Sequence, residues 1–259
     1  MDLGIKGKKA IVCASSQGLG YACALALAQE GCEVFINGRN EDKLLLAADK
    51  LRHLTGAAVN AVQADLNTDS GRSTLLMACP EPDILVNNNA GPPPGQLVDW
   101  DHAAWMGALE SNLLSAALLM REVMEGMRHR RFGRIVNITS AMVKTPHAAM
   151  GLSTAARAGL TALSKALARE AIIDNVTINN LLPERFDTPR QEFMAQRLMK
   201  ELGITREEAR AQIASTLPIQ RMGDPEEFGA ACAFLCAATS GFITGQNLQL
   251  DGGAYAGLI

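Results

Sequence analysis

The stretch Ile11-Val12-Cys13-Ala14-Ser15-Ser16-Gln17-Gly18-Leu19-Gly20 decides how the rest of the 259-residue chain is interpreted. The apolar run Ala10–Val12 is typical of the end of a buried strand, and Tyr21–Glu30 is an Ala/Leu-rich helix closed by Gly31. The small residues between them place bare backbone N–H groups at a helix N-terminus, which is an anion site and usually holds a nucleotide diphosphate. The spacing Ala14-x-x-x-Gly18-x-Gly20 is equally compatible with plain packing of a helix on a strand, so the remaining chain has to decide.

Composition limits the possible partners. Apolar residues make up 48% of the chain, charged residues 20%, and the formal net charge is −3. This balance provides no basic surface for nucleic acid or for an anionic membrane, so we expect neither as a partner. The N-terminus lacks the apolar region of a signal peptide, and no apolar run is long enough to span a bilayer, which predicts a cytoplasmic protein. The six cysteines show no Cys-x-x-Cys or Cys/His spacing, so we expect no metal and buried, reduced thiols.

Short apolar runs alternate with helical patterns from end to end, which predicts an α/β fold. The further strands are expected at Glu33–Ile36, Ala58–Ala64, Asp83–Val86, Arg134–Ile138, Thr177–Leu182 and Asn247–Leu250. The further helices are expected at Asn40–Leu54, Ser70–Cys79, Asp101–Met127, Ser153–Ile173 and Pro225–Ala238. Such alternation predicts a doubly wound, Rossmann-like parallel sheet of seven strands with helices on both faces. No linker or repeat interrupts it, so residues 1–259 are expected to form a single domain.

One segment departs from the alternation. Gln191–Ser215 contains two charged helical stretches after the sixth strand, at the sheet edge where doubly wound folds bind ligands. We interpret residues 190–216 as a helical lid over the substrate; the alternative is a solvated helical hairpin.

The accumulated motifs resemble the short-chain dehydrogenase/reductase family over essentially the whole chain, and most closely its β-ketoacyl-acyl-carrier-protein reductase-like members. They are the Ala14–Gly20 turn, Asp65 after the third strand, Asn87–Gly91, Asn112, Ile135–Ser140, Asn179-x-x-x-Pro183 with Thr188, Ile243–Gln246 and Asp251–Gly253. The resemblance implies a nicotinamide cofactor, a small carbonyl or alcohol substrate, and a homo-oligomer, tetramer or dimer. The long helices Asp101–Met127 and Ser153–Ile173 would form one interface.

The cofactor site can be assigned residue by residue from this resemblance. The implied cofactor-binding residues are Ala14, Ser16, Gln17, Gly18, Leu19, Gly20, Arg39, Asp65, Leu66, Asn88, Asn89, Ala90, Arg157, Pro183 and Thr188. Asp65 resembles the residue that binds the adenine amino group. Ala14 replaces the family's first glycine, and its methyl group requires a negative φ there. The motif after the fourth strand lies at Asn88–Gly91 if it is matched literally, or at Asn87–Ala90 if it is counted from Asp83 without a gap.

The end of the second strand favours NADP(H) over NAD(H). Members that prefer NAD carry an acid there for the ribose hydroxyls, whereas this chain has Asn37-Gly38-Arg39-Asn40. A guanidinium matches a 2′-phosphate in bidentate fashion, and no carboxylate is present to repel it. The alternative is that Arg39 only faces solvent.

The catalytic residues match the family in part. Asn112 and Ser140 correspond to the family's water-holding asparagine and substrate-binding serine. Where the family's Tyr-x-x-x-Lys pair is expected, the chain has Ser153 and Arg157, and no Tyr-x-x-x-Lys occurs elsewhere. An aliphatic hydroxyl is a far weaker acid than a phenol, and arginine does not deprotonate. The loss of general acid catalysis typically costs about 10²–10⁴-fold in rate, which weakens a reductase without necessarily abolishing it.

Other residues near the expected site are candidate proton donors. Lys144 and His147 lie in the loop between Ser140 and Ser153, although both are equally explained as solvated loop residues; a relay through Ser153 is a further option. Glu184, which follows Pro183 where the family usually has glycine, either changes the charge preference of the site or is an ordinary turn residue.

Two functions therefore follow from the sequence. The first is an NADP(H)-dependent oxidoreductase that transfers a hydride between the nicotinamide and a carbonyl or alcohol substrate with an atypical active site. The second is a catalytically degenerate NADP(H)-binding protein that serves as a sensor or as a subunit of an assembly.

Overall fold

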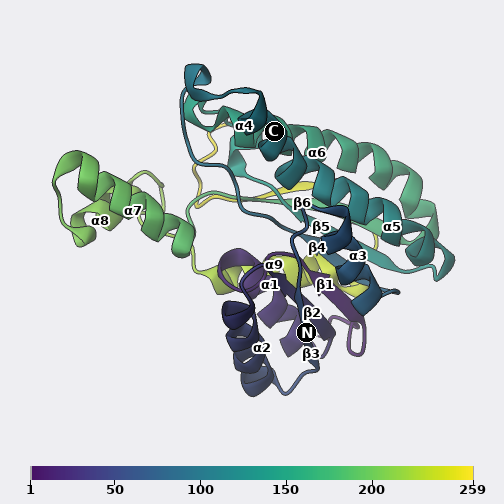
Figure 1. Cartoon of the computed structure of the whole chain (residues 1–259). Helices are drawn as coiled ribbons and strands as arrows, with labels where there is room; N and C mark the ends of the chain where they lie inside the picture. Colours follow the sequence, from purple (N-terminus) through teal and green to yellow (C-terminus); the bar gives the residue numbers. More distant parts are fainter. Residues whose placement is uncertain (1, 259) are drawn as a thin grey trace.

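A computed structural model describes residues 2–258 and contains one parallel sheet with helices on both faces (Figure 1). The strands are β1 (Lys9–Val12), β2 (Glu33–Gly38), β3 (Val59–Gln63), β4 (Ile84–Asn87), β5 (Gly133–Ile138), β6 (Val176–Pro183) and β7 (Asn247–Leu250). Their order in the sheet is β3-β2-β1-β4-β5-β6-β7. The order reverses at β1, so the crevice beside its carboxyl end is the switch point where such sheets bind ligands. The predicted fold class is confirmed.

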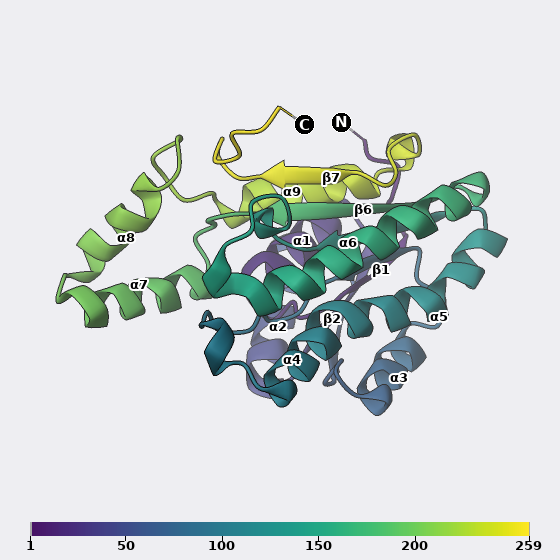
Figure 2. The same ribbon diagram turned by 90° about the horizontal axis from the view of Figure 1, so that it is seen from above.

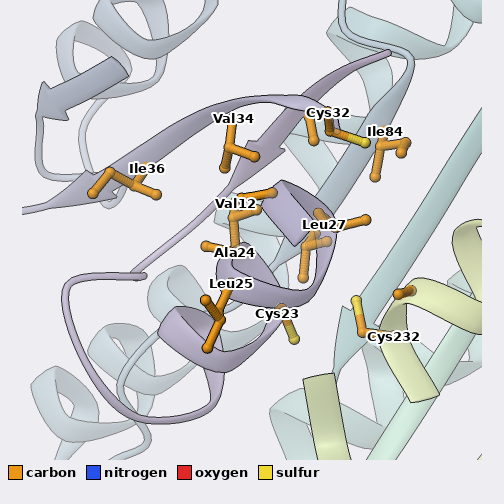
Figure 3. Packing of buried hydrophobic residues seen from close by; sticks show 14 of the residues in the cluster. Val12, Cys23, Ala24, Leu25, Leu27, Cys32, Val34, Ile36, Ile84 and Cys232 are labelled. Atoms are coloured by element: carbon orange, nitrogen blue, oxygen red, sulfur yellow. The ribbon is translucent and has the colours of Figure 1, made fainter. Parts of the chain in front are cut away.

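Most of the helices pack in two layers, one on each face of the sheet, around two buried clusters, and α7 and α8 lie apart from them. They are α1 (Gly18–Gln29), α2 (Glu41–Thr55), α3 (Asp69–Ala78), α4 (His102–Leu109), α5 (Ser115–His129), α6 (Gly151–Ala171), α7 (Pro189–Leu202), α8 (Arg206–Ser215) and α9 (Pro225–Cys236). Helices α1, α2 and α9 contribute to the cluster on one face, whereas α3, α5 and α6 contribute to the cluster on the other. Figure 3 shows the first cluster, in which α1 packs between the strands and α9 through small and branched side chains.

The cysteines lie in these clusters. All six are buried and free, as the sequence predicts, and three of them, Cys23, Cys32 and Cys232, are visible in Figure 3. Burial raises the pKa of the Cys13 thiol, below the Gly-rich turn, to about 12. Thiols in such surroundings are poor nucleophiles and pack as small apolar groups.

The predicted helix Asp101–Met127 differs from the structure in its interior. Helical backbone runs from His102 to His129, but the turn Glu110–Leu114 is a π-helix between α4 and α5. Such turns are rare and concentrate at functional sites, and this one contains Asn112. Hydrophobic periodicity does not resolve a single extra residue in a turn, which is why the sequence predicts a continuous α-helix.

The same segment corrects the expectation about membrane spans. His102–His129, at 28 residues, is long and apolar enough to cross a bilayer by length and composition alone. Its inward side belongs to the buried cluster with α6, and Figure 2 shows the two helices side by side along the sheet. A core helix of an α/β protein meets the same criteria, so we assign no membrane segment to it.

Helices α7 and α8 form a hairpin that projects from the rest of the molecule (Figures 1 and 2). The hairpin has its own small apolar cluster around Ala195, Ala209 and Ile213. An ion-pair group, in which Arg206 and Arg210 contact Glu192, joins the two helices on the outside. The hairpin therefore holds its own shape, and the first two turns of α7 connect it to the ligand cleft described next.

Candidate functional site

A cleft of about 720 Å³ follows the carboxyl edge of the sheet. It is lined by most of the residues that the sequence assigns to a cofactor: Ala14, Ser16, Gln17, Gly18, Leu19, Arg39, Asp65, Leu66, Asn88, Asn89, Ala90, Arg157, Pro183 and Thr188. Ser140 and Ser153 line it as well. Gly20 and Asn112 do not line this cleft; Gly20 packs against Ala14 and Asn88, and Asn112 lines a separate small cavity.

The Gly-rich turn is held by contacts that only small residues permit. A Cβ added to Gly20 would lie 2.4 Å from the carbonyl oxygen of Ala14 and 2.9 Å from Nδ2 of Asn88. Asn88 Nδ2 donates to the same Ala14 oxygen at 3.1 Å, which joins the end of β4 to the turn. The N-terminus of α1 has no side-chain cap at Gln17, so its first N–H groups stay available for an anion.

Ala14 departs from the prediction for this turn. Its φ is +45°, in the left-handed region that alanine rarely adopts, whereas the sequence argument required a negative φ. The structure accommodates the strain through two hydrogen bonds: Ala14 N donates to Asn37 Oδ1 at 3.3 Å and its carbonyl accepts from Asn88. A left-handed non-glycine residue costs about 1–2 kcal/mol, which the surrounding contacts must offset.

Asn37 has a role that sequence reasoning missed. Its side chain is buried and donates to the carbonyl oxygens of Val62 and Ala64, both at 3.1 Å, while its Oδ1 accepts from Ala14. This single amide therefore ties the carboxyl ends of β1, β2 and β3 together. Arg39, two residues later, is exposed at the rim of the cleft. The stretch thus contains a buried amide, Asn37, that connects three strands, and an exposed cation, Arg39. Nothing in the sequence distinguishes these two roles.

At the other half of the cleft, Arg157 is buried with no ion pair to any carboxylate in the described residues. The residue is 8% exposed, and its Nη1 donates to the carbonyl oxygens of Ile138 at 2.6 Å and Thr139 at 2.8 Å. Its Nε donates to Ser153 Oγ at 3.2 Å. Burial first, and then the positive charge of Arg190, lower the pKa of this guanidinium to about 10, so it stays charged at neutral pH. Arg157 therefore fixes both the end of β5 and the Ser153 hydroxyl.

Ser153 and Ser140 bring two hydroxyl groups to this half. Ser153 is 5% exposed, and because its oxygen accepts from Arg157, its own proton is free to be donated. Ser140 Oγ accepts from the backbone N of Met142 at 3.2 Å, which fixes the serine at the start of the loop after β5. A cleft lined by two hydroxyl groups, one of them in contact with a cation, has the chemistry to bind a carbonyl or alcohol oxygen.

Asn112 lies next to a second, very small cavity of about 10 Å³. Its Nδ2 donates to Ala90 O at 3.3 Å, whereas its Oδ1 is buried without a partner in the part of the chain that the structure describes, as is Oδ1 of Asn87. Both asparagines and Arg157 line the cavity, whose size suits one water molecule. The structure therefore places Asn112 close to Arg157, although outside the main cleft.

The loop between Ser140 and Ser153 carries the two candidate proton donors, and only one of them lines the cleft. Lys144 Nζ donates to Gln249 Oε1 at 3.2 Å and lies over the ring of Tyr255, away from the cleft. His147 lines the cleft, and its Nδ1 accepts from the backbone N of Ala149 at 3.3 Å. Its Nε2 is therefore the nitrogen available to a ligand.

Glu184 and several residues of α7 complete the lining. Burial raises the pKa of the Glu184 carboxyl, and the ion pair with Arg185 at 3.1 Å partly offsets this. From α7 come Arg190, Gln191, Phe193 and Met194, which sequence reasoning placed only within a lid segment. The single signal for them was their position after the sixth strand.

The geometry defines an α/β dinucleotide-binding protein with a polar site at one end of its cleft. A family model described as enoyl-(acyl carrier protein) reductase matches residues 13–255. The chain belongs to the short-chain dehydrogenase/reductase family, as its motifs predict.

Individual relatives match over nearly their full length. The uncharacterized oxidoreductase YvaG of Bacillus subtilis is 35% identical over 258 residues, covering 98% of both chains. The 3-oxoacyl-[acyl-carrier-protein] reductase FabG of Vibrio cholerae is 31% identical, covering 98% of this chain and 99% of that one. The crystal structure of L-sorbose reductase from Gluconobacter frateurii, complexed with NADPH and L-sorbose, superposes with a TM-score of 0.94 at 31% identity over 100% of both chains.

Proposed function

We propose that this protein is an NADP(H)-dependent oxidoreductase that interconverts a carbonyl and an alcohol in an atypical active site. The observation that carries the proposal is the single cleft that joins the Gly-rich turn to Ser140, Ser153 and Arg157. The relatives support the reaction class, since they include reductases and an NADPH complex.

The residues of the first half fit a dinucleotide. The uncapped N-terminus of α1 offers N–H groups to a diphosphate, and Gly20 allows the backbone of Ala14 to lie beside it. Asp65 and Leu66 would hold the adenine, and Arg39 a 2′-phosphate, which is why we propose NADP(H) over NAD(H). Pro183 and Thr188 would border the nicotinamide. When bound, this cofactor supplies or accepts the hydride.

The residues of the second half would handle the substrate oxygen. Ser153 would donate a hydrogen bond to the carbonyl, and its contact with the Arg157 cation makes it a stronger donor than a free hydroxyl. Ser140 would donate to the same oxygen. A fixed cation and two donors in a partly dry site stabilise the negative charge that develops on this oxygen. The proton itself would come from the imidazolium form of His147, which lines the cleft, rather than from Lys144, which does not. In that form Nδ1 carries a proton and gives up its contact with Ala149 N, and the ring is left neutral after the transfer.

The remaining parts of the proposal concern architecture. We propose that residues 1–259 act as one domain, that the hairpin of α7 and α8 is a lid over the substrate, and that Asn112 holds a water molecule beside Arg157. A homo-oligomer, tetramer or dimer, in the cytoplasm is consistent with the family. The exposed apolar residues Met106 and Leu114 on the α4–α5 segment support a subunit interface there.

The competing function is an NADP(H)-binding protein without turnover, a sensor or assembly subunit, and Ser153 with Arg157 favours it. Mixing the purified protein with NADPH and a panel of aldehydes and ketones separates the two. We expect NADPH fluorescence to report binding, and absorbance to fall only when a substrate is present. Binding without any substrate-dependent loss of absorbance would establish the alternative, and the Ser140→Ala variant serves as the low-activity control.

A further inference from the structure

The catalytic half of the cleft carries more positive charge than the proposed chemistry uses. Arg157, Arg185 and Arg190 all line it, and the carboxylate that lines the same region is Glu184. Glu184 is paired with Arg185 at 3.1 Å, so these two charges offset each other. Arg157 and Arg190 have no carboxylate partner within residues 2–258. Two uncompensated guanidinium groups remain.

These two guanidinium groups, from α6 and α7, contact the same loop, the one that follows β4. Arg157 Nη2 contacts the carbonyl oxygen of Asn89 at 3.5 Å, and Arg190 Nη2 donates to the carbonyl oxygen of Pro92 at 3.2 Å. Between these carbonyls, a Cβ on Gly91 would lie 3.6 Å from Arg157 Nη2. The charge of Arg190 also contributes to the lowered pKa of Arg157. The cations are therefore close enough to repel each other, a cost that a bound anion would remove.

Arg190 is well placed to bind a ligand. It is partly buried, stacks on the Phe193 ring at 5.8 Å, and makes a single hydrogen bond, so most of its five N–H donors have no acceptor in the described part of the chain. Burial, followed by the charges of Arg197 and Arg185, lowers its pKa. Buried cations are normally paired, so an unpaired one that lines a cleft indicates an anionic ligand.

The next residue gives independent support. Gln191 is 6% exposed and lines the same cleft, yet its Oε1 has no hydrogen-bond partner among residues 2–258. A buried amide oxygen without a partner costs about 1–3 kcal/mol, which a ligand hydroxyl would recover. Neighbouring side chains thus provide donors for an anion and an acceptor for a hydroxyl group.

Resting on the proposed function, we infer that Arg190 makes this cleft select carbonyl compounds that carry an anionic group, a carboxylate or a phosphate, close to the carbonyl. The reducible carbonyl would lie at Ser140 and Ser153, and the anionic group of the same substrate would bind to Arg190. The positive charge of Arg157 would add to the electrostatic attraction of the anion. Gln191 would accept a hydroxyl of the same substrate.

Matched pairs of probes test the inference by direct binding to the NADP⁺-loaded protein. Pyruvate, acetoacetate and levulinate, in which the carboxylate lies progressively farther from the carbonyl, are each compared with their methyl esters. Dihydroxyacetone phosphate is compared with dihydroxyacetone. We expect at least one anion to bind about ten to a hundred times more tightly than its neutral counterpart, the range of a charge-assisted hydrogen bond. The best pair identifies the anion and its spacing.

Three variants assign the preference to Arg190. Arg190→Gln is expected to abolish most of the preference and Arg190→Lys to retain part of it. Arg197→Gln, on the same helix but paired with Glu201 at 3.1 Å, is expected to leave it unchanged. NADPH affinity is measured in parallel for every variant.

Two outcomes overturn the inference, and a third tests the proposed function separately. Equal binding of anions and neutral counterparts by the wild type contradicts it, even if NADPH binds and esters are reduced. Loss of NADPH affinity in Arg190→Gln with an unchanged anion preference would assign the guanidinium to the cofactor diphosphate instead. If NADPH binds but no probe is reduced, the proposed function fails, while the binding ratios still decide the selectivity.

Discussion

The two halves of the cleft achieve their shape in different ways. In the β1–β3 half, backbone groups and small residues form the site. The close approach of Gly20 to the carbonyl of Ala14 and the hydrogen bonds of the buried Asn37 amide together fix the conformation of the turn. In the β5–β6 half, long side chains form it, chiefly Arg157 and Arg190. A site made of backbone constrains residue size, whereas a site made of side chains can change its chemistry by substitution. This difference supports our proposal that the chain combines a family-like cofactor turn with an atypical proton donor.

Restoring the family's pair in the second half should have the largest effect. The double variant Ser153→Tyr with Arg157→Lys introduces a phenol whose pKa a neighbouring lysine can lower towards neutrality. We expect the rate of carbonyl reduction to rise by about 10²–10⁴-fold, the usual contribution of a general acid. The measurement is kcat/KM with NADPH and the best substrate of the panel.

The single variants serve as controls for that comparison. Ser153→Tyr alone is expected to gain little, because Arg157 would remain bonded to the Ile138 and Thr139 carbonyls and does not deprotonate. His147→Asn should lower the wild-type rate by about tenfold or more if His147 is the donor, and should not affect the double variant. A double variant that folds, binds NADPH and stays as slow as the wild type would show that more than the acid is missing.

In the first half, the largest effect should come from Gly20→Ala. The added Cβ would meet the Ala14 carbonyl at 2.4 Å, so the turn must move away from the phosphate position. We expect a loss of about 2–3 kcal/mol in the free energy of unfolding and about a hundredfold in NADPH affinity. Urea denaturation and NADPH fluorescence titration measure the two. Gly107→Ala, on the exposed side of α4 with open space around its Cβ, should instead gain about 0.5–1 kcal/mol.

Arg39 should have a smaller effect, confined to the choice of cofactor. Removing its charge in Arg39→Gln is expected to weaken NADPH binding by about ten- to fiftyfold and leave NADH binding unchanged, because only NADPH carries the 2′-phosphate. The neighbouring exposed cation Lys43, which does not line the cleft, is the control: Lys43→Gln should change both affinities by less than about twofold. Equal losses for both cofactors in Arg39→Gln would show a general electrostatic effect instead.

The same contrast explains what the sequence could predict. The seven strands, the parallel sheet and the position of the Gly-rich turn follow from local patterns, such as the small residues after Val12, because each depends on residues close in sequence. The conformation of Ala14 within that turn does not follow from them. The role of Asn37 as a tie between three strands, the pairing of Arg157 with the β5 carbonyls and the approach of Arg190 to Pro92 depend on groups brought together by the fold. Local patterns carry no record of such distant contacts.

Ala14 belongs to a turn that the local sequence predicts, but it is held by contacts with the distant residues Asn37 and Asn88. Of the variants considered, Ala14→Gly should have the smallest effect. At φ +45° alanine is strained and glycine is not, so the variant should gain about 1 kcal/mol in the free energy of unfolding despite the larger entropy of unfolded glycine. The same substitution at Ala103, exposed in the first turn of α4, should lose about 0.5–1 kcal/mol, because glycine is unfavourable in a helix. Opposite signs for the two variants in urea denaturation would confirm that the turn, rather than the residue type, sets the outcome. A loss at both positions would mean that the contacts of Ala14 with Asn37 and Asn88 stabilise the turn only when its methyl group is present.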